Sequence, residues 1–219
     1  KKDLESIGAK NVDVIYYGFD EPEFEHFQTK ESTDFIFFHG GLLGEDRNPI
    51  SFLNALKQLL IEHPEIRSNV RIKLAGEVDH AVRESIRIND LDGLTEYMGM
   101  IPRQQVLEEY AEASMLLLPI NKAANAKGRI PGKLFEMLRT GKPILVFGPN
   151  DGDVKQIVEE KQLGKSFDYS EELFIYAYLK KALIHNEIGN FNPSQHVSEY
   201  SNKAITQKIA GYLDEIAES

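Results

Sequence analysis

From Phe35 onward, short apolar runs alternate with longer stretches in which apolar residues recur at helical spacing. This alternation is typical of repeated strand–helix units, in which the strands pair in parallel and the helices pack on the sheet. The run 115–118 is apolar at every position, which indicates a strand buried on both faces. The sequence therefore predicts an α/β fold with a parallel sheet of about six strands and helices on both faces.

Apolar runs, prolines and glycines set the expected boundaries of the strands and helices. We expect Asn48 to cap the first helix after the first strand and Pro49 to occupy its first position. The expected strands are 35–38, 70–75, 94–98, 115–118, 143–147 and 165–168. The other expected helices are 82–88, one that starts at Pro102, 131–140, 154–160, 171–185 and 204–217, with a polar connector at 186–193.

Residues 1–20 do not form a complete strand–helix unit. Residues 1–7 have the pattern of a helix end, and residues 12–17 have the pattern of a strand. We expect them to be the last elements of a preceding domain together with the linker that follows it, so that this chain is part of a longer protein.

Composition narrows the function classes. The chain has 219 residues, enough for one sizeable core and too few for two full domains. Its formal net charge of −10 argues against a nucleic-acid partner, which requires a basic surface. The chain has no cysteine, which excludes disulfides and thiolate metal sites. No apolar run approaches the ~20 residues of a membrane helix, and we expect a cytoplasmic protein, peripheral to a membrane at most.

The loop after the first strand matches a dinucleotide-binding fingerprint only in part. Gly41 and Gly44 have the spacing of its last two glycines, but His39 stands in place of the first. The residues about 20 positions further on are apolar instead of acidic. The pattern argues against a nicotinamide or flavin site, and we predict no resident cofactor. His39 still lies at the carboxyl end of a strand, where parallel sheets bind ligands.

Asp151 and Asp153 resemble the paired aspartates that hold a metal and a diphosphate in one class of sugar transferases. They directly follow an expected strand, and Asp153 and Gln156 have the spacing of a helix-capping pair. The capping interpretation is favoured over the metal site, and we predict no metal.

The most informative stretch is 128–136, where a glycine and a proline precede a helix. Free N–H groups and the helix dipole favour an anion such as a diphosphate at such a position. Lys133 would reinforce the anion site, and Glu136 could accept hydrogen bonds from ribose hydroxyls. The spacing fits a capped surface helix with solvated Lys133 and Glu136 about equally well.

Four stretches in order along the chain resemble retaining glycosyltransferases of family 4. Residues 14–20, VIYYGFD, are similar to the family's linker between two Rossmann-like halves, with Tyr17 in place of the usual Asn. Residues 40–49 are similar to the loop that opens the donor-binding half, and 113–119 to a buried strand of that half. The most specific match is 130–143, IPGKLFEMLRTGKP.

The resemblance implies a GT-B C-terminal domain with a Rossmann-like sheet. Residues 1–20 would be the end of the N-terminal domain and the linker, and 21–200 the nucleotide-sugar-binding domain. Residues 201–219 would form a helix that packs toward the N-terminal domain of the same protein. The implied function is transfer of a hexosyl group from a nucleoside diphosphate sugar to a glycan or lipid-linked acceptor of the cell envelope.

The resemblance also assigns roles to residues, although it names no catalytic residue in this chain. Glu136 would bind the ribose. The nucleobase would lie beside Gly99, Ile101 and Arg103. The donor phosphates would be bound by Gly40, Gly41, Arg47, Arg129, Pro131, Gly132 and Lys133.

Besides Tyr17, two positions depart from the family pattern. Gly128 stands where a second, sugar-contacting glutamate is expected, and Gly41 stands where an arginine is common. Both departures leave the expected nucleotide-binding residues in place, but they do not indicate which sugar is bound. Two alternatives therefore remain, a non-catalytic nucleotide-sugar-binding module and a GT-B sugar epimerase.

Overall fold

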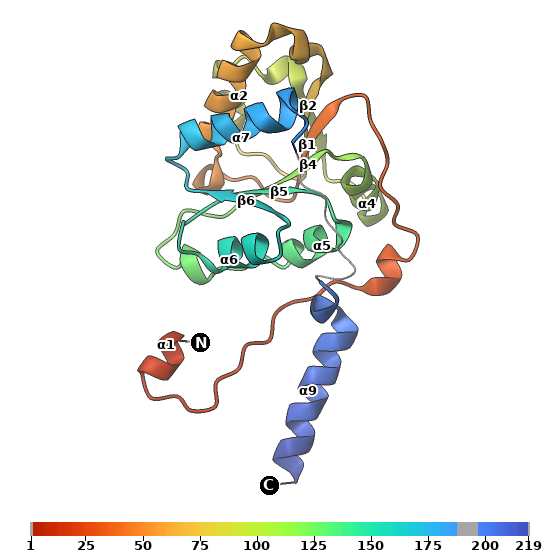
Figure 1. Cartoon of the computed structure of the whole chain (residues 1–219), viewed down its shortest axis with the longest axis vertical. Helices are drawn as coiled ribbons and strands as arrows, with labels where there is room; N and C mark the ends of the chain where they lie inside the picture. Colours follow the sequence, from red (N-terminus) through yellow and green to blue (C-terminus); the bar gives the residue numbers. More distant parts are fainter. Residues whose placement is uncertain (1, 188–196, 219) are drawn as a thin grey trace.

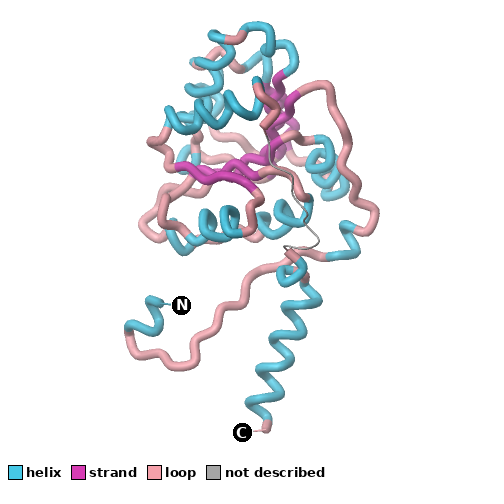
Figure 2. The backbone as a smooth tube through the Cα atoms, viewed as in Figure 1, coloured by secondary structure: helices cyan, strands magenta, loops and turns pink. Residues whose placement is uncertain are grey.

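The computed structural model describes residues 2–187 and 197–218 and contains one six-stranded parallel sheet (Figures 1 and 2). The strand order is β3-β2-β1-β4-β5-β6, so the order reverses between β1 and β4. The strands are β1 (Phe35–Gly40), β2 (Val70–Ala75), β3 (Thr95–Gly99), β4 (Met115–Pro119), β5 (Ile144–Phe147) and β6 (Gly164–Phe167). The predicted α/β fold and parallel sheet are confirmed, and every predicted strand from Phe35 onward lies within two residues of the observed one.

Helices cover both faces of this sheet, as predicted. The α-helices are α1 (Lys2–Ser6), α2 (Ile50–Glu62), α3 (His80–Ile88), α4 (Arg103–Glu112), α5 (Lys133–Thr140), α6 (Asp153–Glu160), α7 (Glu172–Ile184) and α9 (Asn202–Ala217). Short 3-10 turns are η1 (Glu21–Phe24), η2 (Glu45–Arg47), η3 (Pro64–Asn69), η4 (Asp92–Leu94), η5 (Ala126–Gly128) and η6 (Ser198–Tyr200).

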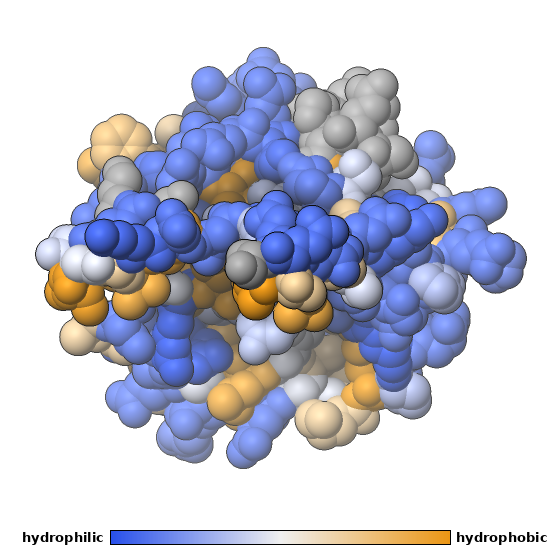
Figure 3. Space-filling model, turned by 90° about the horizontal axis from the view of Figure 1, so that it is seen from below, coloured by the Kyte–Doolittle hydropathy of each residue, from blue (hydrophilic) through white to orange (hydrophobic). Residues whose placement is uncertain are grey.

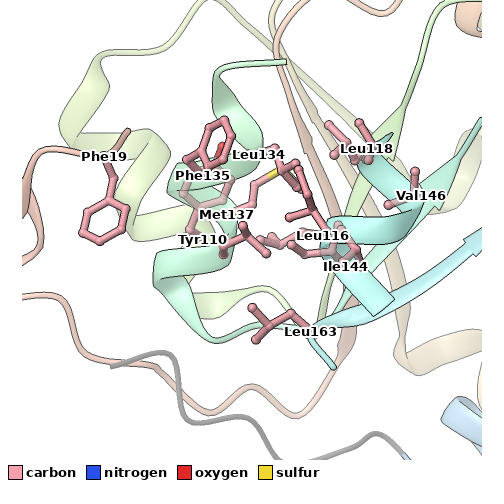
Figure 4. Close-up of a cluster of buried hydrophobic side chains, with 14 of the residues drawn as sticks. Phe19, Tyr110, Leu116, Leu118, Leu134, Phe135, Met137, Ile144, Val146 and Leu163 are labelled. Atoms are coloured by element: carbon pink, nitrogen blue, oxygen red, sulfur yellow. The ribbon is translucent and has the colours of Figure 1, made fainter. Parts of the chain in front are cut away.

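Two hydrophobic clusters lie on opposite faces of the sheet because successive strand residues point to opposite sides. One cluster joins Leu116 and Leu118 of β4 to α4, α5 and α6, and Figure 4 shows how Phe135 and Met137 of α5 pack within it. The other joins Leu117 of the same strand to α2, α3 and α7. Burial on both faces explains why β4 is apolar at every position.

Three local predictions were wrong. Residues 12–17 form no strand, because among the described residues no strand lies beside them to share backbone hydrogen bonds. Asn48 does not cap α2, because its side chain instead donates to Ser85 and the Ala81 carbonyl of α3. Asp153 and Gln156 form no capping pair, because Gly152 occupies the cap position and the Gln156 amide donates to Glu160.

The segment before the sheet and the segment after it pair with each other near Phe19 and Ser201. Phe19 is buried and pairs with Ser201 in a parallel bridge, and Lys208 of α9 donates to the Val14 carbonyl. Beyond this junction α9 projects from the body (Figure 1), and no residue of α9 is buried. Seen from that end, hydrophobic side chains lie among hydrophilic ones (Figure 3).

Within the described residues, none of the helices combines the length and the apolar character needed to cross a membrane. The predicted connector 186–193 falls mostly outside the described residues, as does the 188–196 part of the predicted domain 21–200.

Candidate functional site

A pocket of about 260 Å³ lies at the carboxyl edge of the sheet, beside the end of β4. In a parallel sheet all strand ends of one kind share an edge, and ligands bind where the strand order reverses. Here that point lies between β1 and β4. The lining residues come from η2, the end of β4, the loop that follows it and the start of α5, and they are Arg47, Pro119, Ile120, Asn121, Arg129, Ile130, Pro131 and Lys133. All three charged residues among them are cations.

Lys133 reaches from the first turn of α5 across to the end of β1. Its Nζ donates to the Gly40 carbonyl at 3.0 Å, and it has no carboxylate ion-pair partner among the described residues. Burial and the nearby charge of Arg47 lower the pKa of Lys133 to about 8, while Glu136 acts in the opposite direction. The ammonium is therefore held in surroundings that favour an added negative charge.

The other two cations of the pocket differ in their partners. Arg47 pairs with the adjacent Asp46, with Nε 3.1 Å from the carboxylate. Arg129 is exposed and makes no ion pair within the described part of the chain. The side of the pocket that Lys133 and Arg129 line is therefore positively charged, and no acidic side chain is among the described residues that line the pocket.

The loops after β1 and β2 pack backbone against backbone under this edge. Gly41 and Gly76 have positive φ values of 121° and 105°. A Cβ on Gly76 would lie 2.6 Å from the Gly41 oxygen, and a Cβ on Gly41 would lie 3.3 Å from Lys133 Nζ. Glycine at both positions lets the loop after β1 lie close to the ammonium. Gly76 was not among the predicted site residues, although a glycine directly after an apolar strand is a signal visible in the sequence.

Glu136 lies one turn further along α5 and forms an ion pair instead of facing solvent alone. Arg103 Nη1 is 2.8 Å from Glu136 Oε2, and Arg103 Nη2 is 2.5 Å from Glu23 Oε2. Burial lowers the pKa of Arg103, but hydrogen bonds to Glu23 and Glu136 raise it overall. Glu23 was missed, because nothing in the sequence indicates that η1 lies beside α4.

His39 is buried under the edge, and its imidazole faces the core. Its Nδ1 lies 3.0 Å from the Leu117 carbonyl, and Nε2 has no hydrogen-bond partner among the described residues. Burial, and then the charge of Lys133, lower the pKa of His39 to about 3, so the ring is neutral. A neutral, buried ring of this kind packs beneath the site.

The structure thus brings part of the predicted site together. Arg47, Arg129, Pro131 and Lys133 line the pocket, and Gly40 and Gly41 adjoin it through Lys133. Gly132 is the exposed cap residue of α5. The residues predicted to bind the nucleobase do not line this pocket. Gly99 is the exposed last residue of β3, Ile101 packs on the core cluster, and Arg103 lines a separate groove beside α4.

Carboxylates do not gather into a metal site within the described ranges, where no group of three or more histidine, aspartate or glutamate side chains lies close enough to hold an ion. Asp151 instead pairs with Lys127 at 2.5 Å, which lowers the pKa of its carboxyl.

No protein-family model matches this chain, and no curated protein matches it in sequence. Solved structures do match. The lipopolysaccharide outer core galactosyltransferase WaaB aligns with 98% of this chain and 59% of its own, at 10% identity and a TM-score of 0.71. The C-terminal domain of a group 1 glycosyl transferase, LpcC from Francisella tularensis, aligns with 91% of this chain and 98% of its own, at 13% identity and a TM-score of 0.52.

An epimerase has the same fold. A UDP-N-acetylglucosamine 2-epimerase aligns with 97% of this chain and 54% of its own, at 14% identity and a TM-score of 0.57. This chain therefore spans less than two thirds of the length of the galactosyltransferase and of the epimerase. At these identities the matches show the fold. The chain has a Rossmann-like fold of the GT-B type, and its structural neighbours include GT-B glycosyltransferases.

Proposed function

We propose that this chain is the C-terminal, nucleotide-sugar-binding domain of a retaining glycosyltransferase of family 4. The enzyme would move a hexosyl group from a nucleoside diphosphate sugar to a glycan or lipid-linked acceptor of the cell envelope, and would work in the cytoplasm. The fold and the neighbouring glycosyltransferase structures support the class, and the motif around Lys133 supports the family.

The observation that carries the proposal is the cationic pocket at the start of α5. Lys133 and Arg129 face it without carboxylate partners among the described residues, and Arg47 closes one side. Two uncompensated cations match a diphosphate ester, which carries about two negative charges. The pocket also lies where the strand order reverses, the expected ligand position for such a sheet.

The same residues suit the chemistry of sugar transfer. When the bond between the sugar and the diphosphate breaks, negative charge grows on the departing diphosphate. Cations and helix dipoles already in place stabilise that charge without reorganisation. Lys133 and the first turn of α5 would meet the diphosphate oxygens, with Arg47 opposite.

Calorimetry with UDP, GDP, ADP, CDP and TDP tests the proposal directly. We expect at least one of them to bind, and inorganic diphosphate to compete with it. Bound ligand should also raise the melting temperature, since it stabilises only the folded state. The variant Lys133→Ala should lose most of the affinity, whereas Lys155→Ala, which removes a lysine from α6 away from the pocket, should not. No binding of any diphosphate at millimolar concentration would contradict the proposal.

The epimerase match favours a second candidate that uses the same nucleotide site. The family pattern has a sugar-contacting glutamate at the position of Gly128. Its absence is the reason to consider both this epimerase and a non-catalytic module. A Cβ on Gly128 would meet no atom within 4 Å, so packing does not exclude a larger residue. Conversion of UDP-N-acetylglucosamine into an isomer of the same mass, detected by chromatography, would show that the protein is an epimerase. Nucleotide binding without either reaction in the full-length protein would identify the module.

A further inference from the structure

Arg103 joins two carboxylates that come from distant parts of the chain. Its Nη1 donates to Glu136 Oε2, while Nε and Nη2 donate to Glu23 in a two-pronged contact. All three nitrogens of the guanidinium therefore donate to acids. Arginine is suited to this arrangement, because its planar fork matches a carboxylate and fixes its orientation.

Glu23 is itself held firmly. It lies in η1, whose neighbouring residue Phe24 is buried in the core, and Pro22 restricts the backbone before it. The ring of Phe24 packs against Phe19 and Phe27. Glu23 thus presents its carboxylate from a fixed turn instead of a free loop.

Glu136 has one oxygen committed and one available. Arg103 contacts Oε2, and no hydrogen bond to Oε1 is present among the described residues. Tyr110 is buried, and its pKa is raised by burial and then by the charge of Glu136. The Glu136 side chain is itself partly buried, and burying a carboxylate is costly unless a cation is beside it. Arg103 supplies that cation.

We propose that Glu23 and Arg103 are positioning residues for the ribose of the bound nucleotide. Glu23 orients Arg103, Arg103 orients Glu136, and the free oxygen of Glu136 accepts hydrogen bonds from the ribose hydroxyls. This inference rests on the proposed nucleotide-binding function. The proposed role takes the place of the expected contact between Arg103 and the nucleobase, because the guanidinium of Arg103 already donates hydrogen bonds to two carboxylates.

The test compares Glu23→Gln with Glu21→Gln in the 219-residue chain. Both variants remove one negative charge from η1, but Glu21 makes no contact with Arg103. The probes are UDP, GDP, ADP or CDP, whichever binds most tightly, its 2′,3′-dideoxy analogue and inorganic diphosphate. We expect Glu23→Gln to weaken binding of the ribonucleotide about tenfold. Binding of the dideoxy analogue and of inorganic diphosphate should not change, and Glu21→Gln should bind all three like the unaltered chain.

A double-mutant cycle separates positioning from general structural support. If Glu23 acts through Glu136, then Glu23→Gln should have little further effect in a Glu136→Gln background. Arg103→Lys should behave like Glu23→Gln, since a lysine has one nitrogen in place of the planar fork of three that fixes the orientation of both carboxylates. Equal losses for the ribonucleotide and its dideoxy analogue would overturn the proposal, as would additive effects in the cycle.

Two results separate this inference from the proposed function. If the chain binds no nucleotide, both are overturned. If Glu136→Gln weakens ribonucleotide binding but Glu23→Gln does not, the nucleotide site stands and the positioning role of Glu23 is overturned.

Discussion

Lys133 keeps its charge at a cost to folding. Its pKa in the folded chain, about 8, lies below the ordinary value of 10.5 because of burial and the charge of Arg47. Below pH 8 the folded chain must hold an ammonium that its surroundings disfavour. As the pH rises from about 8 toward 10.5 that penalty is relieved, because there the unfolded chain binds more protons than the folded one. An anion bound beside Lys133 would remove the same penalty at neutral pH, which is the behaviour of a binding residue.

This property predicts the pH dependence of binding. Diphosphate affinity should be greatest below pH 8 and should fall as the pH rises through and beyond 8, because Lys133 then loses its proton. In Lys133→Arg the guanidinium stays charged across this range, so the affinity should change much less with pH. Titration calorimetry with inorganic diphosphate from pH 7 to pH 10 measures both. Parallel pH profiles for the two proteins would show that Lys133 is not the titrating group.

The variant Glu136→Gln tests whether the negative charge of this side chain contributes to nucleotide binding. Replacing Glu136 by glutamine keeps the size of the side chain but removes a charged acceptor. Nucleotide binding should weaken by roughly 1.5–3 kcal/mol. A 2′,3′-dideoxy nucleotide should bind the variant and the unaltered chain equally well. If both proteins bind the intact ribonucleotide with the same affinity, Glu136 does not contact the ribose.

At the scale of elements, the site depends on how closely the loops after neighbouring strands approach. Gly76 donates its N–H to the Gly99 carbonyl, and Gly41 donates to the Ala75 carbonyl. These hydrogen bonds link the ends of β1, β2 and β3 into one layer. The loop after β1 is thereby held close enough for the Gly40 carbonyl to accept from Lys133. The cationic edge therefore depends on the close backbone packing of Gly41 and Gly76.

Gly76→Ala tests this layer. The added Cβ would clash with the Gly41 backbone, and a φ of 105° is strained for alanine. We expect a loss of about 1–3 kcal/mol in the free energy of unfolding, together with weaker diphosphate binding. Gly93→Ala is the matched control, because a Cβ at that position meets no atom within 4 Å. Equal stability of the two variants in urea unfolding would contradict the close packing of the two loops.

At the scale of the whole molecule, the described residues form one sheet with the cationic pocket at one edge, while α9 projects and none of its residues is buried. The chain spans 59% of the galactosyltransferase that it matches. Sugar transfer requires a second reactant to be oriented against the donor, and such orientation is worth up to ~7–11 kcal/mol of barrier.

We therefore expect residues 1–219 to bind a nucleotide sugar without transferring the sugar. The measurement uses radiolabelled donor and a cell-envelope extract as the source of acceptor, with the full-length protein as the positive control. Lys133→Ala in the full-length protein should remove transfer and binding together. Robust transfer by residues 1–219 alone would show that this chain carries a complete active site.

The sequence by itself determined the layered architecture and the cation at the start of α5. Apolar runs such as 115–118 located the strands, because burial on both faces of a sheet leaves no polar positions. The pair Pro131 and Gly132 located the start of the helix near Lys133. Local patterns suffice for such features, because each depends on residues a few positions apart.

Only the tertiary structure decided which distant groups meet. Asn48 donates a hydrogen bond to Ser85 of α3 instead of capping α2, and Ser85 lies far away in the sequence. Residues 12–17 form no strand, because no strand of the described residues lies beside them. The contact of Arg103 with Glu23 and Glu136 spans 80 and 33 positions. Such pairings depend on the order of strands in the sheet and on which helices lie side by side, and these are set by the packing of the whole chain.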